Sequence, residues 1–210
     1  MTRHSHPSIA QNLPVPPHGE LAGDDVALYR RFVEGDNRAF TLLYQRHNGK
    51  LLAYTTRMTR DAMLAQDLSH EAWGRMVKLR NAKRDLENPI GFLMRMARNL
   101  CLDSLKSRSR SVQLSTVDAS EQPVCFIPEP SEYEELVVRS LEMLSFDYRE
   151  VLVLNIYCGY SLEEIGVMLG KSSQAIWTRA SRARKALRKL VEAANSDISA
   201  NHVSPGRYTQ

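Results

Sequence analysis

The sequence predicts an all-α protein made of two small helical domains joined by a flexible linker, with a helix-turn-helix in the second domain. Apolar residues recur at three- and four-residue steps through both halves, as in helices with one buried face. Proline, which breaks helix interiors, is absent from residues 131–194 and occurs only as Pro89 in residues 24–110. Residues 151–157 are strand-like in composition but have no second strand to pair with, so we expect a buried helix there.

The proline and charge pattern also predicts where the domains begin and end. We expect a loose tail at residues 1–22, a helical domain at 24–110, an acidic, proline-containing linker at 111–130, a second domain at 131–194 and a tail at 195–210. The length of 210 residues is compatible with two small domains.

The first domain reads as a bundle of four helices. A short helix precedes Gly35, and a longer apolar stripe runs from Phe40 to Met58. A third helix starts near Asp61 and continues to Leu79. The fourth begins at residues 88–89, where an asparagine N-cap is followed by proline at the first helical position.

The second domain carries repeated signals for helix starts and stops. Three pairs have the spacing of a capping box, in which an N-cap side chain and an acid three residues later bond each other's backbone: Ser131 with Glu134, Asp147 with Glu150, and Ser161 with Glu164. Glycines at positions 159 and 170 stand where helices should stop.

Residues 162–185 have the spacing of a helix-turn-helix. Gly166 is small enough for two helices to cross closely, Gly170 suits a left-handed turn, and Ser172 can cap the second helix. The outward arc of that helix carries amide, hydroxyl and cationic side chains, which suit the major groove of DNA. An ordinary basic helical hairpin is the alternative interpretation.

Charge and composition narrow the function class. The net charge is +4, and basic residues gather at 95–110 and 171–189 around an acidic segment, which favours a polyanionic partner. No apolar run reaches the ~18 residues of a membrane span, and three cysteines show no metal-ligand spacing. Asp67 and His70 lack the second acid–histidine pair that a metal-carboxylate enzyme needs. We therefore expect a non-enzymatic, cytoplasmic protein without cofactor or metal.

Several fragments, in this order, resemble the extracytoplasmic-function (ECF) sigma factors, initiation subunits of bacterial RNA polymerase. The resemblance covers residues 24–194 and rests on Gly35-Asp36, Asp67-Leu68 with Glu71, Phe92 through Asn99 to Asp103, Arg149-Glu150, Leu162-Glu-Glu-Ile165, Leu169-Gly170 and Ser181-Arg-Ala-Arg184.

The resemblance implies three binding surfaces. Docking on the clamp helices of the RNA polymerase core is implied for Asp67, Leu68 and Glu71; the flap of the polymerase is an implied partner as well. Recognition and melting of the −10 element is implied for Arg80, Asn88, Phe92, Arg95, Asn99 and Asp103. Reading of the −35 duplex is implied for Ser173, Gln174, Trp177, Thr178, Arg179, Ser181, Arg182 and Lys185. Members of the family are usually regulated by an anti-sigma factor. The resemblance also implies that the linker passes through a channel of the polymerase; a plain spacer is the alternative.

Four positions depart from the family pattern, one of them His70, where a glutamine is common. Trp177 stands where a basic residue is usual, Gly74 interrupts the polymerase-binding helix, and Ser145 replaces part of a proline-containing helix entry. Because residue 177 borders the buried stripe, we expect its indole to pack on the helix-turn-helix core; contact with a thymine methyl group is the alternative. A helix-turn-helix regulator with an N-terminal sensing domain is the alternative function.

Overall fold

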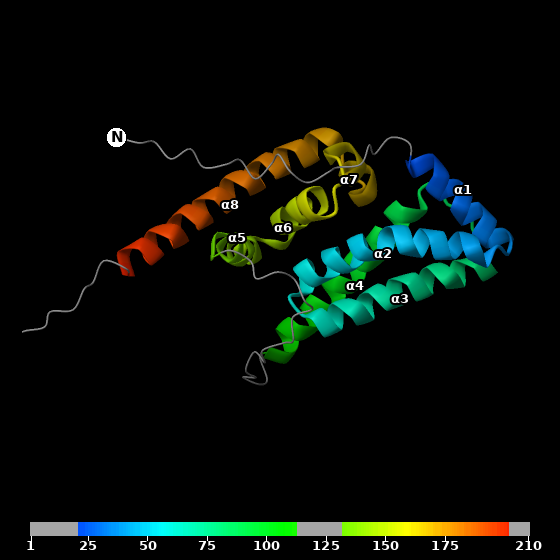
Figure 1. Cartoon of the computed structure of the whole chain (residues 1–210), viewed down its shortest axis with the longest axis horizontal. Helices are drawn as coiled ribbons and strands as arrows, with labels where there is room; N and C mark the ends of the chain where they lie inside the picture. The colour runs from blue at the N-terminus through cyan, green and yellow to red at the C-terminus, as the bar shows by residue number, and fades with distance from the viewer. Residues whose placement is uncertain (1–20, 113–131, 202–210) are drawn as a thin grey trace, which may run out of the picture.

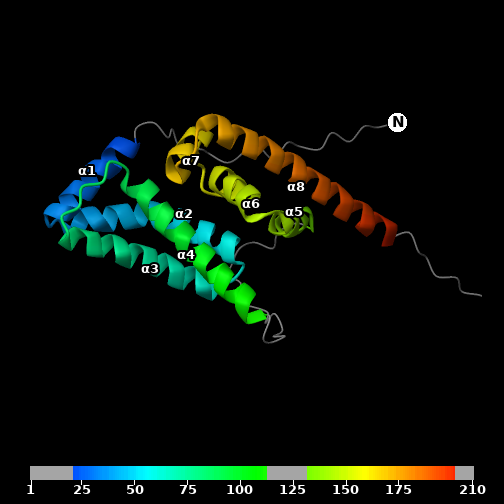
Figure 2. The ribbon, with the colours of Figure 1, turned by 180° about the vertical axis from the view of Figure 1, so that it is seen from behind.

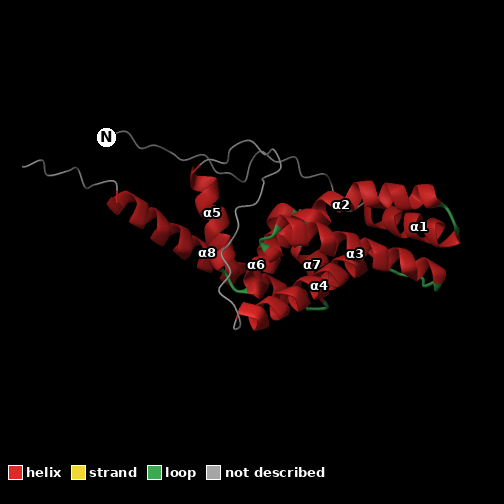
Figure 3. Ribbon diagram, turned by 90° about the horizontal axis from the view of Figure 1, so that it is seen from below, coloured by secondary structure: helices red, strands yellow, loops and turns green. Residues whose placement is uncertain are grey.

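A computed structural model describes residues 21–112 and 132–201 of the chain. Figure 3 shows these residues as helices and connecting loops, and they contain no strand. The all-α prediction is therefore confirmed for this part of the chain. The elements, in chain order, are α1 (Leu21–Glu34), α2 (Asn37–Thr59), α3 (Ala62–Asn81), α4 (Pro89–Val112), α5 (Glu132–Met143), α6 (Phe146–Leu152), the π-helical turn η2 (Val153–Tyr157), α7 (Leu162–Leu169) and α8 (Ser173–Asn201).

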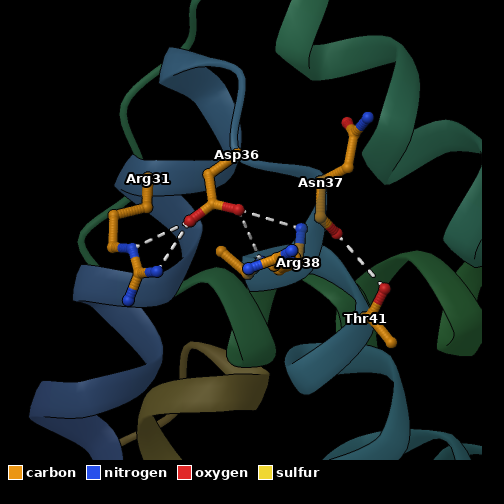
Figure 4. A network of polar contacts seen from close by, with 6 residues as sticks. Arg31, Asp36, Asn37, Arg38 and Thr41 are labelled. Atoms are coloured by element: carbon orange, nitrogen blue, oxygen red, sulfur yellow. Dashed lines mark hydrogen bonds and ion pairs between the residues drawn. The ribbon is translucent and has the colours of Figure 1, made fainter.

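Helices α1 to α4 form the four-helix bundle expected for the first domain (Figure 1). The turn between α1 and α2 is built around Asp36, which accepts hydrogen bonds from the backbone N–H groups of Arg38 and Ala39 and an ion pair from Arg31 (2.6 Å; Figure 4). The expected stripe of α2 faces the core. Its one histidine, His47, is buried against the Asp25 carboxylate of α1 at 2.8 Å.

The start of α4 depends on a contact that only glycine permits. The Asn88 Oδ1 atom accepts a hydrogen bond from the Gly91 backbone N–H at 2.7 Å, which confirms the predicted N-cap. A Cβ atom added at Gly91 would lie 2.6 Å from the Asn88 amide nitrogen. The cap therefore excludes any side chain at position 91.

The capping boxes of the second domain have three different outcomes. The box at Ser161 and Glu164 is confirmed, since each side chain bonds the other residue's backbone N–H (3.1 and 2.7 Å). The box at Asp147 and Glu150 was wrong. Helix α6 begins two residues earlier, after an N-cap at Ser145 that makes no side-chain bond, and Glu150 is turned inward. Ser131 lies outside the described residues.

Residues 151–157 are helical and buried, as expected, but not regularly so. Helix α6 gives way to the π-helical turn η2, after which Gly159 takes a left-handed conformation with φ of 72°. The Asn155 side chain donates a hydrogen bond to the Tyr160 carbonyl at 2.8 Å and secures this reversal.

The helix-turn-helix forms between α7 and α8. Gly170 ends α7 in the left-handed conformation (φ 62°). A Cβ atom on Gly166 would lie 3.1 Å from the Lys171 carbonyl oxygen, so the glycine allows the close crossing. The Ser172 hydroxyl accepts a hydrogen bond from the Ala175 backbone N–H (3.3 Å) and caps α8.

Helix ends extend past the predicted domain boundaries. Helix α8 continues to Asn201 rather than ending at 194, and α4 reaches Val112, inside the expected linker. Residues 113–131, which hold most of that linker and one of the three cysteines, lie outside the described residues; the other two cysteines are buried and free.

The two helical groups pack on each other, with α7 against α4 and η2 against α2 (Figures 1 and 2). Their buried apolar residues form one cluster. The contact leaves an open pocket of about 530 Å³ between α7 and the first domain, lined by Lys50, Asn88 and Tyr160 among others.

Candidate functional site

Helix α8 presents a polar arc on the side away from its core. Ile176, Ala180 and Ala183 are buried in the second domain. Amide, hydroxyl and cationic side chains lie on the exposed side, namely Ser173, Gln174, Thr178, Ser181, Arg182 and Lys185. These are six of the eight residues for which the sequence implied a −35 contact.

Arg179 differs from the other residues of the predicted −35 set. Its side chain is largely covered, and its Nη2 atom lies 3.5 Å from the Asp147 carboxylate of α6. In this structure the Arg179 guanidinium therefore forms an ion pair within its own domain.

Trp177 does not pack in the core of the helix-turn-helix as we expected. Its side chain is 52% exposed, and its indole N–H donates a hydrogen bond to Glu163 Oε1 of α7 at 3.1 Å. A hydrogen bond from its own backbone N–H and the one from the indole hold the pKa of Glu163 below its usual range. The neighbouring helix offers a carboxylate here rather than an apolar groove, so packing was the wrong expectation.

Helix α4 carries an exposed stripe made of three residues from the predicted −10 set. Arg95, Asn99 and Asp103 follow one another at four-residue intervals and are all exposed. An amide and a carboxylate can bond base edges, and an arginine can neutralise the strand. The stripe therefore has the chemistry of a nucleic-acid contact.

The other three residues of the predicted −10 set have structural partners. Arg80 donates a hydrogen bond to Asn37 Oδ1 (2.7 Å) and lies over the Phe32 ring. Asn88 caps α4, and Phe92 packs partly buried against the bundle core with the Arg84 guanidinium over its ring. Asn88 and Phe92 thus hold the start of α4, and Arg80 ties the end of α3 to α1 and α2.

Helix α3 places the predicted polymerase-binding residues together. Asp67 and Glu71 are exposed one turn apart on the same face, while Leu68 is 8% exposed and anchors the helix to the core. Glu71 forms an ion pair with Arg75 at 2.6 Å. Gly74 lies within the unbroken helix, with open space where a Cβ atom would stand.

One polar site that the sequence analysis missed lies between the two helical groups. Glu150 of α6 is fully buried, and its Oε1 atom accepts hydrogen bonds from Arg98 Nε of α4 (2.8 Å) and Tyr54 Oη of α2 (2.9 Å). Burial raises the pKa of Glu150. The sequence assigned Glu150 to a capping box with Asp147, three residues before it. Nothing in the sequence therefore pointed to a partner from another helix.

Two further properties of the described residues bear on function. Within residues 21–112 and 132–201, no group of three or more His, Cys, Asp or Glu side chains could hold a metal ion. None of the helices in these ranges is long and apolar enough to cross a membrane.

Comparisons with known proteins agree with the helical groups. The model of Sigma-70 region 2 matches residues 43–111, and that of Sigma-70 region 4 matches residues 134–187. The ECF RNA polymerase sigma factor SigL of Mycobacterium tuberculosis (strain H37Rv) is 31% identical over 155 residues, covering 71% of this chain and 87% of SigL. The chain belongs to the ECF sigma factors.

The match with a second relative covers more of both chains. The RNA polymerase sigma factor CarQ of Myxococcus xanthus is 29% identical over 163 residues, covering 77% of this chain and 94% of CarQ. ECF sigma factors are not enzymes; they direct the RNA polymerase core to a class of promoters and support melting of the DNA at initiation. The comparisons therefore favour this function over that of a ligand-sensing regulator.

Two solved structures share the fold of this sigma factor. The sigma factor RpoE, in a complex with the anti-sigma factor NepR from Bartonella quintana, has a TM-score of 0.61 at 24% identity, covering 73% of this chain and 96% of RpoE. CnrH, in a complex with the cytosolic domain of CnrY, has a TM-score of 0.59 at 24% identity, covering 81% of this chain and 98% of CnrH.

Proposed function

We propose that three helices divide the work of this sigma factor: α3 docks on the polymerase, α4 binds the −10 element and α8 reads the −35 duplex. The observation that carries the proposal is that each helix buries one face in a core and leaves the implied binding residues on the other. These residues are Asp67 and Glu71 on α3, the stripe of α4 and the polar arc of α8.

The docking surface of α3 suits a basic helix of the polymerase clamp. Asp67 and Glu71 offer two carboxylates one turn apart, and Glu71 already accepts an ion pair from Arg75. Exposed ion pairs of this kind contribute only ~0.2–1 kcal/mol, so Glu71 exchanges Arg75 for a partner cation at small cost.

The −10 surface consists of the exposed stripe of Arg95, Asn99 and Asp103. Asn99 and Asp103 supply bonding groups for the edge of an unstacked base, and Arg95 supplies charge for the strand. Arg80, Asn88 and Phe92 act by holding the end of α3 and the start of α4, since each is already held by a partner.

The partners of the sigma factor follow from this division. The RNA polymerase core is contacted by the clamp-binding face of α3 and, at the flap, by the second domain, and promoter DNA lies on α4 and α8. We place the protein in the cytoplasm, where polymerase and promoters are found. Both solved neighbours are complexes, one with an anti-sigma factor, which supports regulation of this chain by an anti-sigma partner.

Transcription by the reconstituted holoenzyme tests the proposal. Run-off transcription with core polymerase on a library of promoter fragments should return a −35/−10 promoter class for the wild-type chain. The double variant Asp67→Arg/Glu71→Arg should lose core binding in a pull-down assay while its helical circular dichroism is unchanged.

A matched control makes the docking test specific. The double variant Glu34→Arg/Glu135→Arg changes the charge by the same amount at exposed positions of α1 and α5, and it removes a comparable ion pair of Glu135 with Arg139. It should bind core normally. Normal core binding by the α3 double variant would refute the docking assignment.

A further inference from the structure

The contact between the two helical groups is centred on Arg98 of α4. Its guanidinium donates to the fully buried Glu150 carboxylate at 2.8 Å and lies over the Phe146 ring at 5.6 Å, so that only 28% of the side chain is exposed. The Tyr54 hydroxyl donates a hydrogen bond to the same carboxylate oxygen at 2.9 Å. An arginine of the proposed −10 helix is thus covered by the proposed −35 domain.

A single carboxylate links the two proposed DNA-binding helices. Asp147 Oδ1 lies 3.9 Å from Arg98 of α4, and Asp147 Oδ2 lies 3.5 Å from Arg179 of α8. Promoter elements centred at −10 and −35 are about 25 base pairs apart, or ~85 Å of B-DNA at about 3.4 Å per pair. Two arginines on one carboxylate cannot serve elements so far apart, so the helical groups must separate before both are bound.

The interface has features of a contact that opens. The second oxygen of Glu150 is buried without a hydrogen-bond partner, as is the Tyr160 hydroxyl, and an open pocket of about 530 Å³ remains between α7 and the first domain. Buried polar groups without partners weaken packing, and a pocket that water can enter leaves part of the facing surfaces uncovered.

Separation would leave Arg98 beside the −10 stripe. Arg98 lies three residues from Arg95, so the two guanidinium groups are neighbours on the surface of α4, at the border of the stripe that Arg95 shares with Asn99. A guanidinium binds phosphate oxygens with the same paired N–H groups that it offers to a carboxylate. Carboxylates of α6 therefore hold Arg98 in the way that a nucleic-acid backbone would.

We propose that Arg98 is a phosphate contact for the melted −10 strand, and that the closed packing of the two domains masks it on Glu150 until the chain opens. The inference rests on the proposed function of α4. It makes closure and −10 binding mutually exclusive, because one guanidinium serves both.

Single-stranded DNA binding by the full chain distinguishes a DNA contact from a merely structural residue. The probe is a fluorescein-labelled single-stranded oligonucleotide of mixed sequence, and the radius of gyration from solution scattering reports separation of the domains. Arg98→Ala removes the cation that pairs with Glu150, so the radius of gyration should rise. DNA affinity should nevertheless fall several-fold, and the slope of log affinity against log salt should decrease by about 0.7, the value for one single-strand phosphate.

The opposite sign would overturn the inference. If Arg98 only held the domains together, Arg98→Ala would open the chain and strengthen DNA binding. Arg139→Ala, which removes one exposed cation from α5, is the charge-matched control and should change neither quantity. If Arg98→Ala proves unfolded by circular dichroism, Arg98→Lys decides: an unchanged salt slope with weaker binding supports the phosphate contact, and stronger binding refutes it.

Promoter melting by the holoenzyme distinguishes failure of the Arg98 contact from failure of the proposed function. With core polymerase bound, Arg98→Ala should slow promoter melting, measured by permanganate reactivity, whereas Glu150→Gln should melt at the wild-type rate because the domains are apart. Equal defects in both variants would show a structural pair and refute the phosphate contact. A wild-type chain that neither binds core nor initiates would instead refute the proposed function.

Discussion

Trp177 of the recognition helix donates its indole N–H to the Glu163 carboxylate of the preceding helix, across 3.1 Å. The bond links the two helices of the helix-turn-helix on their exposed side, while Ile176, the preceding residue, fills the buried angle between them. It also fixes the orientation of an aromatic ring that is half exposed beside the polar arc of α8. We infer that Trp177 reads the −35 duplex with its ring edge and that Glu163 positions it.

The neighbours Trp177 and Ile176 give opposite predictions. Trp177→Ala should leave the melting temperature almost unchanged, since exposed substitutions cost within ~0.5 kcal/mol. It should relax base discrimination at one −35 position by ~1–3 kcal/mol, measured on single-base promoter variants. Ile176→Ala should lower stability by ~2–5 kcal/mol, because it empties a fully buried site. A large stability loss in Trp177→Ala would restore the packing role.

Local signals in the sequence predicted the helices well, because caps and periodic stripes act within a few residues. Asn88, Ser161 and Gly170 all occupy the positions that their residue types indicated. Because these signals act only over a few residues, they miss contacts between distant parts of the chain, and this explains the wrong capping box. The spacing of Asp147 and Glu150 fits a capping box, but burial of Glu150 against Arg98, 52 residues away, determines the real geometry.

The exposure of the proposed DNA-binding side chains was predictable only where no other element offers them a hydrogen-bond or ion-pair partner. Arg95 and Asn99 are exposed as the helical period requires. Arg80 and Arg179 meet acceptors from other elements, Asn37 and Asp147, which sequence spacing does not place. Tertiary contacts of this kind cannot be obtained from a single sequence.

Two glycines in helices should respond in opposite ways to alanine. Gly91→Ala should destabilise the first domain by at least the ~1 kcal/mol of a lost N-cap, because its Cβ atom displaces the Asn88 amide. Gly74→Ala meets open space and should stabilise the helix by up to ~1 kcal/mol. Chemical denaturation of both variants checks the pair. A loss of stability in Gly74→Ala would contradict the open space that the structure shows beside Gly74 on α3.

Two serine N-caps in the second domain differ in the same testable way. Ser161→Ala removes the hydroxyl that caps α7 and should cost ~1 kcal/mol of stability. Ser145→Ala starts α6 without any side-chain cap bond to lose, so its effect should stay within ~0.5 kcal/mol. Thermal melts of the two variants measure the difference, and equal losses would contradict the two cap geometries.

The buried carboxylate of Glu150 makes domain closure depend on pH. Burial raises its pKa, while Arg98 and the Tyr54 hydroxyl oppose that shift and nearby Asp147 adds to it. Once the domains separate, water surrounds the carboxyl and its pKa returns to the ordinary value of 4.5. The closed state thus binds the proton more tightly than the open state. Its extra stability is complete below pH 4.5 and is lost as pH rises through the raised pKa.

Lowering the pH from 7.5 toward 5 should therefore favour the closed chain. The radius of gyration of the wild type should decrease over this range, and binding of single-stranded DNA at fixed salt should weaken. Glu150→Gln carries a neutral side chain at every pH, so this variant should stay compact and lose the part of the pH response that belongs to position 150. Other carboxylates titrate equally in both proteins, and the difference between the two curves isolates Glu150. Identical curves for the wild type and the variant would refute its role in closure.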